Sequence, residues 1–392
     1  MIQREISLAI ESLKSKFPVI TVTGARQTGK TTLLKALYKN LPYVNLEDID
    51  NRLLAEEDPR GFLSNFPEGA VIDEVQQVPQ LFSYIQQLVD NNDEVHFALS
   101  GSQNFQLMEN ITQSLAGRTA IFNLASLSYS ELKDAGFTFE RAEDLIFSGG
   151  YPRIFDKDID PAVYFQNYLS TYVERDVRQI KSIENLSLFM RFIQLCAGRI
   201  GQPVNFQSLS NDVGVSLNTI KSWISVLEAS YIVYLHRPFY ENFNKRITKT
   251  PKLFFYDTGV ACSLLNIQNP EQLYSHYLTG GLFENFVLNE MNKTYFNRGK
   301  KPAFYFWQNK ERKEIDLIID TGLKQFPFEI KAAQTKNRHF FDNLKYWQKL
   351  NEIPSEYLNV TYGGDEDFKT SNGNFVSWRN IPEVVFSVES AK

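Results

Sequence analysis

The sequence predicts an α/β protein whose first domain is a parallel sheet covered by helices on both faces. The first observation is GARQTGKT at residues 24–31, which fits the phosphate-loop pattern G-x-x-x-x-G-K-[ST]. The second is its context, because an apolar, β-branched run (18–23) precedes it and a run with helical periodicity (30–38) follows. The third is a continuing alternation of strand-like and helical segments. Together these features predict that the chain binds a nucleoside triphosphate.

Each part of this loop has a chemical reason. A strand, a glycine loop and a helix in that order surround one anion with backbone N–H groups and a helix N-terminus. Gly24 and Gly29 allow conformations and a close approach that a Cβ would hinder. Lys30 is expected to reach the β- and γ-phosphates, and the Thr31 hydroxyl to ligate Mg²⁺. The predicted nucleotide contacts are Gly24, Ala25, Arg26, Gln27, Thr28, Gly29, Lys30, Thr31 and Thr32.

Composition indicates a soluble globular protein of several domains, since 392 residues suffice for roughly two to four cores. The net charge of −5 argues against an extended nucleic-acid-binding surface but not against a local basic face. Cys196 and Cys262 have no metal-ligand spacing, which favours a reduced, cytoplasmic setting. The charged N-terminus, with Arg4 and Glu11, predicts an amphipathic helix, not a signal peptide. The sequence contains no run of about 18 apolar residues, so it predicts no membrane span.

Four strand-like segments follow the phosphate loop at residues 43–46, 70–73, 95–100 and 119–122, with a helix expected at 81–90. The phrase GAVIDEVQ ends the second of them in two acids. Asp73 is expected to hold Mg²⁺ beside Thr31, and Glu74 to polarise the attacking water. The alternative is that both acids cap a strand-to-helix turn.

Two further motifs supply candidates for catalysis. The strand at 95–100 ends HFALSGSQN, and its candidate for contacting the γ-phosphate or the water is Ser100, with Ser102 or Asn104 as alternatives. A polar cap of the following helix would account for any one of them equally well. Arg118, in LAGR, is a candidate for neutralising transition-state charge in cis or in trans. Its alternative role is a surface cation at a helix C-terminus.

The phrases GARQTGKTTLL, VIDEVQ, SGSQN and LAGR, the last followed by FNLASLSYSEL, resemble a family of prokaryotic AAA-type P-loop ATPases. This family is close to the archaeal and signal-transduction ATPases, and its members carry a C-terminal region of unknown function. The resemblance continues through SGGYPR at 148–153 and YVERDV at 172–177. It implies a P-loop NTPase fold, ATP with Mg²⁺ as cofactors and ATP hydrolysis as the activity.

The middle of the chain is predicted to be helical and then winged-helix. Residues 126–190 are expected to form a helical lid, in which Arg175 either contacts nucleotide or, more commonly for such a residue, pairs with neighbouring acids. In 191–260, a helix, a turn at Gly214, an N-cap at Ser216 and a second helix form a helix-turn-helix pattern. The basic residues of the expected wing could neutralise nucleic-acid phosphates, or the winged helix could serve protein contact or domain packing instead. These basic residues are Arg237, Lys245, Arg246, Lys249 and Lys252.

The last third, residues 261–392, carries a nuclease-like set of residues. Glu284 lies on an expected helix and Asp316 at the edge of an apolar strand. Glu329 and Lys331 share one face of the next strand, because strand side chains alternate. The segment resembles the PD-(D/E)xK restriction-endonuclease-like superfamily, with Ile315 in place of its usual proline. That resemblance implies Mg²⁺ on Glu284, Asp316 and Glu329, with Lys331 orienting water.

These features predict four parts: an ATPase domain (1–125), a lid (126–190), a winged helix (191–260) and a restriction-endonuclease-like α/β domain (261–392). Two functional hypotheses follow. In one, ATP hydrolysis controls a nuclease acting on DNA. In the other, the chain is a nucleotide-dependent regulatory switch whose inactive C-terminal module binds a protein or a nucleic acid. Oligomerisation is compatible with both.

Overall fold

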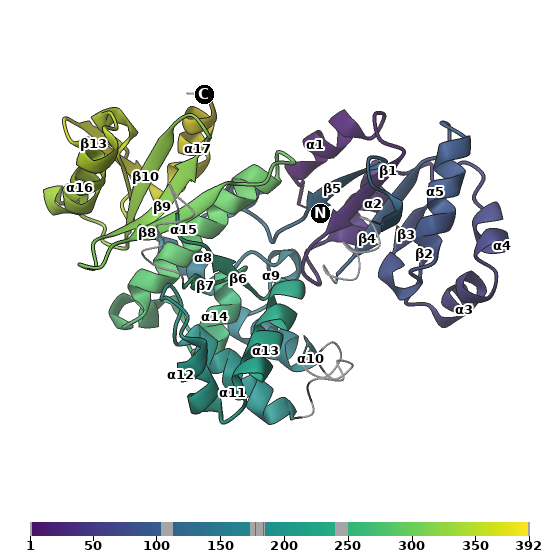
Figure 1. Ribbon diagram of the computed structural model, residues 1–392, viewed down its shortest axis with the longest axis horizontal. Coiled ribbons are helices and arrows are strands. Elements are labelled where there is room, and N and C mark those ends of the chain that lie inside the picture. The colour runs from purple at the N-terminus through teal and green to yellow at the C-terminus, as the bar shows by residue number, and fades with distance from the viewer. Residues whose placement is uncertain are drawn as a thin grey trace. The chain divides into compact units, whose positions relative to one another are not determined.

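The computed structural model describes residues 2–102, 113–172, 177, 183, 185–239 and 250–390 (Figure 1). The chain divides into two compact units. The first comprises Met1–Leu127 with the short segments Ala229–Tyr231 and Tyr295–Lys301. The second comprises Ser128–Glu228, Ile232–Thr294 and Pro302–Lys392. No helix among the described residues combines the length and apolarity needed to cross a membrane.

The first unit is built on a five-stranded parallel sheet of order β2-β3-β4-β1-β5. Its strands are β1 Val19–Thr23, β2 Tyr43–Asn45, β3 Val71–Asp73, β4 Phe97–Gly101 and β5 Thr119–Asn123. Its helices are α1 Ile6–Leu13, α2 Lys30–Leu37, α3 Ile49–Glu57, α4 Pro59–Ser64, the 3₁₀ helix η1 Val75–Gln77 and α5 Leu81–Asn91. Strand β4 lies between β1 and β3, so the expected extra strand between the phosphate loop and the acidic strand is present.

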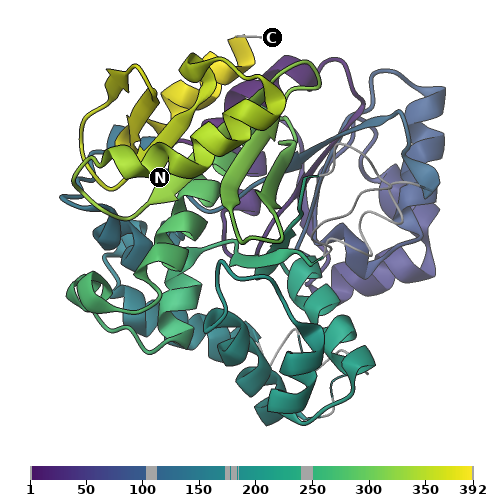
Figure 2. The same cartoon turned by 60° about the vertical axis from the view of Figure 1, so that its left-hand side comes forward.

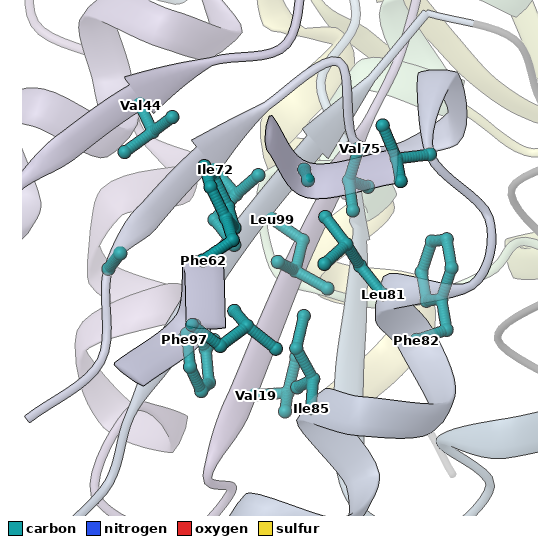
Figure 3. Packing of buried hydrophobic residues seen from close by; sticks show 14 of the residues in the cluster. Val19, Val44, Phe62, Ile72, Val75, Leu81, Phe82, Ile85, Phe97 and Leu99 are labelled. Carbon is teal, nitrogen blue, oxygen red and sulfur yellow. The ribbon is translucent and has the colours of Figure 1, made fainter. Parts of the chain in front are cut away.

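Helices cover both faces of this sheet. On one face, Phe62 of α4 and Ile85 of α5 belong to the same buried apolar cluster as Val19, Ile72 and Leu99 of the strands (Figure 3). On the other face, α1 and α2 pack their apolar residues on a second cluster. Its buried members include Ile6, Ile10, Ile20, Val22, Leu33, Leu34 and Phe122. The α/β architecture and the parallel sheet predicted from the sequence are confirmed, and they match a P-loop NTPase.

The second unit begins with helices. They are α7 Tyr129–Asp134, α8 Ala142–Ser148, α9 Pro152–Lys157, α10 Pro161–Tyr172, α11 Leu186–Ala197, α12 Phe206–Val213, α13 Leu217–Ala229 and α14 Thr258–Leu264, with η3 Pro270–Ser275. Strands β6 Val233–His236 and β7 Lys252–Phe255 pair antiparallel. Gly214, with φ 85°, separates α12 from α13, and Trp223 of α13 stacks edge-on against Phe189 of α11. This order of helices and hairpin is the one expected for 191–260, while the winged-helix assignment and the lid remain predictions.

The carboxyl-terminal part of the chain contains a six-stranded mixed sheet of order β12-β13-β11-β10-β9-β8. Figure 2 shows this part in green to yellow. The strands of this sheet are β8 Phe304–Gln308, β9 Glu314–Asp320, β10 Gln325–Lys331, β11 Asn359–Tyr362, β12 Phe368–Thr370 and β13 Gly373–Ser377. The helices of this part are α15 Thr279–Phe296, η4 Arg338–Phe341, α16 Asp342–Asn351, η5 Ser355–Tyr357, η6 Trp378–Asn380 and α17 Ile381–Ser390. Strands β8, β9 and β10 form an antiparallel meander, and β11 pairs parallel with β10. Leu344 and Trp347 of α16 share one buried cluster with Ile315 and Ile318 of β9. The pairing of β9 with β8 shifts register between Ile318 and Ile315, which interrupts the strict alternation of side chains along β9.

Candidate functional site

The phosphate loop joins β1 to α2 at the carboxyl edge of the parallel sheet. Gly24 has φ 145°, and a Cβ there would lie 2.2 Å from the Leu124 carbonyl oxygen. Gly29, with φ 94°, is the residue immediately before α2. Gln27 also has a positive φ, of 63°. The loop therefore has the tight shape that lets successive N–H groups face one anion, and at Gly24 no larger residue fits.

The lysine of the motif lies against its own loop. Lys30 is only 6% exposed, and its Nζ donates to the carbonyl oxygens of Gly24 at 2.9 Å and Ala25 at 2.8 Å. These are neutral acceptors, so an anion in the loop would compete effectively for the ammonium. Lys30 is thus placed to transfer to a phosphate with little movement of the backbone.

The remaining loop residues have varied environments. The Arg26 guanidinium lies 3.0 Å from Glu47 Oε1. The Thr28 hydroxyl donates to the Ala25 carbonyl at 2.9 Å, which stabilises the turn. Thr32 is exposed in the first turn of α2. Of these residues, Thr32 is open to solvent, while Arg26 already has an ion-pair partner.

Three elements converge on Asp73 at the end of β3. Its Oδ2 accepts from Thr31 Oγ1 at 2.6 Å and from the Tyr43 hydroxyl at 3.0 Å, and its Oδ1 accepts from Ser100 Oγ. Burial, reinforced by the Asp73 charge, raises the pKa of Tyr43, which therefore stays protonated and donates. Thr31 and Asp73 come together as the sequence predicted. Tyr43 was missed, because nothing in its local sequence indicates that it reaches a neighbouring strand.

Glu74 follows Asp73 in a left-handed conformation, with φ 54°, which is uncommon for a residue with a Cβ. Its Oε2 accepts from Ser102 Oγ at 3.2 Å and from Gln76 Nε2. Although Glu74 precedes η1, its side chain makes no cap hydrogen bond to that helix. The backbone turn thus holds the carboxylate over the end of β4, and Ser102 contacts Glu74 whereas Ser100 contacts Asp73.

Arg118 lies elsewhere. Strands β1 and β5 are parallel with Val19 opposite Thr119, so Arg118 lies at the amino edge of the sheet, while the phosphate loop is at the carboxyl edge. Its guanidinium pairs with Asp90 of α5 and donates to the Ala116 carbonyl at 3.1 Å. The expected role in cis is therefore not supported by its position, and a surface ion pair accounts for this arginine. Asn104 and Arg175 lie outside the described residues.

A second arginine, missed in the sequence, lies against the phosphate loop. Arg4 precedes α1 and is 8% exposed. Its Nη1 donates to the Thr28 carbonyl and its Nη2 to the Ala125 carbonyl, both at 2.8 Å. One guanidinium thus ties the loop to the segment after β5. As one charged residue of an amphipathic stretch, it gave no signal of this contact.

A second candidate site, here called the carboxyl-terminal cluster, brings together Asp316 of β9 with Glu329 and Lys331 of β10, as the sequence predicted. Lys331 Nζ lies 2.6 Å from Glu329 Oε1 and 3.9 Å from Asp316 Oδ2. Asp316 Oδ2 also accepts the Ile330 N–H at 2.8 Å. Glu329 is 4% exposed, whereas the Lys331 side chain is 35% exposed. The two acids are therefore buried behind a lysine that solvent reaches.

The same cluster includes two residues that the sequence did not assign to it. Lys252 Nζ lies 2.7 Å from Glu284 Oε1 and also pairs with Glu314. Glu284, Glu314 and Asp316 each offer an oxygen within 4.8 Å of the others. Glu314 had a sequence signal, since it lies two positions before Asp316 on one strand face. Of the two roles expected for Lys252, phosphate neutralisation on a wing or domain packing, its burial at 1% exposure and its ion pairs favour packing.

Electrostatics show that this cluster is short of positive charge. Burial raises the pKa of Glu284 to about 8, with Lys252 opposing the shift and Asp316 adding to it. Burial and the Asp316 charge likewise raise the pKa of Glu329 to about 8 against the opposing effect of Lys331. Burial alone would lower the pKa of Lys331, but Asp316 and Glu329 raise it. Carboxyls in this state favour the arrival of a cation.

Of the basic residues expected on the wing, Arg237 is described and exposed, whereas Lys245, Arg246 and Lys249 lie outside the described residues. On α13, Lys221 is exposed. Of the basic residues predicted for the wing, only Arg237 is therefore both described and exposed, since Lys252 is buried.

Comparison with known proteins agrees with the fold of the first unit. Residues 16–133 match the family model of an AAA domain, in agreement with the P-loop NTPase type of fold. Residues 139–271 and 279–381 match two domains of unknown function, DUF8612 and DUF4143.

Two curated relatives are uncharacterised proteins of Mycobacterium tuberculosis and Mycobacterium bovis. Each is 28% identical over 376 residues, which cover 94% of this chain and 82% of the relative. Among solved structures, a Walker-type ATPase of Pyrococcus abyssi matches with a TM-score of 0.46 and 13% identity, over 68% of this chain and 96% of its own. A signal-transduction ATPase of Pyrococcus horikoshii with a tetratricopeptide repeat sensor matches with a TM-score of 0.24 and 11% identity, over 76% of this chain and 47% of its own.

Proposed function

We propose that the protein is a Mg²⁺-dependent ATPase. The observation that carries this proposal is the convergence of Lys30, Thr31, Asp73 and Glu74 at one edge of the parallel sheet, around a loop whose shape suits a phosphate. The AAA-domain match over residues 16–133 supports the same activity. Hard oxygen donors adjoin the loop, as Mg²⁺ requires.

The chain's own groups divide the work. Lys30 exchanges its loop carbonyls for the β- and γ-phosphate oxygens of ATP. Thr31 and Asp73 hold Mg²⁺, which when bound neutralises charge developing on the phosphates. Glu74 orients the attacking water and accepts its proton. Ser100, which donates to Asp73, keeps that carboxylate directed at the loop.

Replacing Glu74 tests this division of roles. The Glu74→Gln variant should bind ATP as the parent does but release phosphate at least about 100-fold more slowly, because general-base assistance is lost. Glu68→Gln, at an exposed position on the approach to β3, is the matched control and should hydrolyse normally. Nucleotide binding is followed with a fluorescent ATP analogue, and hydrolysis by phosphate release. Normal turnover by Glu74→Gln would remove Glu74 from the mechanism.

For the carboxyl-terminal unit we propose a restriction-endonuclease-like domain that acts on nucleic-acid phosphodiesters. Its support is the order α15, β8, β9, β10, α16, β11 and the contact of Lys331 with Glu329 and Asp316 across two adjacent strands. Buried carboxylates are suitable ligands for Mg²⁺, and Glu329 Oε2 is buried with no hydrogen bond of ordinary geometry among the described residues. Lys331 reaches solvent, where it can orient water or a phosphate.

The alternative is a regulatory switch with an inactive carboxyl-terminal module. One observation favours it: the buried Lys252 ammonium pairs with Glu284 and Glu314, so a side chain neutralises part of the carboxylate charge. In that case ATP hydrolysis controls binding of a protein or nucleic-acid partner, and no bond in the partner is cut.

Plasmid DNA distinguishes the two. With ATP and Mg²⁺ or Mn²⁺, the nuclease proposal predicts nicking or linearisation by the parent, loss in Asp316→Ala and retention in Asp320→Ala, on the same strand. An intact plasmid in every reaction would support the switch. ATPase rates measured with DNA, RNA and without either then show whether nucleic acid is the partner.

A further inference from the structure

We infer that the Lys252 ammonium is a built-in cation of the carboxyl-terminal cluster, so that this cluster takes one divalent metal ion, at its Asp316–Glu329 end. Lys252 then stands where a second ion would otherwise bind. The inference rests on the proposed metal-binding role of the cluster and concerns how many ions it takes.

Lys252 is fixed inside the protein by its strand. It lies in β7 opposite His236 of β6, and Pro203 bridges to it from the other side. The next residues of the strand, Leu253 and Phe254, are fully buried. Its Nζ also lies 5.4 Å from the centre of the Phe306 ring. An ammonium held this way cannot reach solvent without separating the hairpin from its neighbours.

The cluster has two ends with different partners. At one end, Glu284 and Glu314 pair with Lys252. Gln308 Nε2 occupies the second oxygen of Glu314, at 2.6 Å. Both oxygens of Glu314 and Oε1 of Glu284 therefore already have a partner.

At the other end, one carboxylate oxygen of Glu329 is buried without a hydrogen-bond partner among the described residues. Lys331 pairs with Glu329 Oε1, but Glu329 Oε2 is buried and makes no hydrogen bond of ordinary geometry within the described ranges. The Asn343 side chain also approaches this carboxylate. A buried carboxylate oxygen without a donor costs free energy unless a cation reaches it. This is the end where a metal ion has an unused ligand.

Charge supports a single ion. Four carboxylates face two ammonium groups, which leaves two negative charges when all are ionised. The carboxylates are Glu284, Glu314, Asp316 and Glu329, and the ammonium groups are Lys252 and Lys331. One divalent ion balances the cluster, whereas two would leave excess positive charge in a buried place, which is costly.

Manganese binding by the full-length, nucleotide-free protein tests this inference, with free Mn²⁺ measured by electron paramagnetic resonance. The parent should bind one ion that Asp316→Asn loses. Lys252→Met should gain a second ion or bind the first at least about tenfold more tightly, since the competing cation is gone. Lys293→Met, which removes another buried, ion-paired lysine, should match the parent. Parent-like binding by a folded Lys252→Met protein would overturn the inference.

A second variant covers failure of Lys252→Met to fold. Glu314→Gln should keep the single ion with its affinity changed by no more than a few fold, because Glu314 belongs to the lysine's end of the cluster. Loss of the ion in Glu314→Gln would make Glu314 a metal ligand and contradict the inference. Absence of any Mn²⁺ that depends on Asp316 would instead overturn the proposed metal-binding role itself.

Discussion

Hydrogen bonds of single side chains link the phosphate loop to the acidic strand. Thr31 and Asp73 were predictable because their pattern is local and their chemistry demands those residue types. Arg4 and Tyr43 were not, because each acts through a long side chain that crosses to another element. The prediction that Arg118 acts in cis at the nucleotide site failed for a related reason. A motif shows that an arginine ends a segment, but not which edge of the sheet that segment reaches.

Arg4 yields a prediction at this scale. Its two hydrogen bonds from a charged donor to backbone carbonyls should be worth about 1.5–3 kcal/mol each. Arg4→Met should therefore loosen the loop and raise the KM for ATP roughly tenfold, with a smaller effect on kcat. Lys14→Met, which removes a surface pair with Glu11, is the control. Steady-state kinetics decide the matter, and an unchanged KM for Arg4→Met would show that the contact does not position the loop.

At the scale of elements, the SGGYPR phrase has a structural explanation. Asp257, the N-cap residue of α14, accepts the Gly150 N–H at 2.9 Å and the Gly259 N–H at 3.0 Å. Gly149 packs so closely on it that a Cβ would lie 2.1 Å from Asp257 Oδ1. The phrase fastens the end of α8 to the start of α14, which the sequence could not show because the partner lies far along the chain.

Gly149→Ala should thus destabilise the protein by about 2 kcal/mol or more and lower the Tm by several degrees. Both glycines compared here have a positive φ, 60° at Gly149 and 90° at Gly136, but a Cβ at Gly136 meets nothing within 4 Å. Gly136→Ala therefore measures backbone strain alone and should cost clearly less. Equal losses in thermal or denaturant unfolding would refute the proposed clash.

Glu228, near the end of α13, gives a prediction about pH. Burial raises its pKa above 4.5, despite opposing effects of Arg237 and the Leu235 backbone. The folded state thus favours the protonated form, and this contribution to stability is lost as pH rises through the folded pKa. Glu228→Gln should raise the Tm relative to the parent at pH 8 and lose that advantage near pH 4. A difference that stays constant across this range would contradict the assignment.

Secondary structure was predictable where periodicity is strong, as in the strands and helices of the first unit. The burial of Lys252 was not predictable from the basic run that it ends. A local charge pattern cannot reveal that the second strand of a hairpin is buried against a carboxylate cluster. Pairing of β9 with β10 was anticipated from Asp316, Glu329 and Lys331. Glu314 and Lys252 enter the cluster only through tertiary packing.

At the scale of the whole molecule, the two compact units carry two different candidate sites. The first carries the phosphate loop on a sheet of the P-loop NTPase type and matches the family model of an AAA domain, and the second carries the buried carboxylate cluster. We propose ATP hydrolysis for the first and a metal-dependent or partner-binding role for the second. The central claim is that the first unit is an active, Mg²⁺-dependent ATPase, because the proposed control of the second unit by ATP hydrolysis depends on it.

Phosphate release from ATP by the purified full-length protein, with Mg²⁺ and with EDTA, tests that claim most directly. The parent should show Mg²⁺-dependent turnover. Lys39→Ala, an exposed lysine just after α2, should retain it. Lys30→Ala should fall to the background rate, because the loop loses the only side chain that we assign to the β- and γ-phosphates. Turnover by Lys30→Ala at the parent rate would contradict the account.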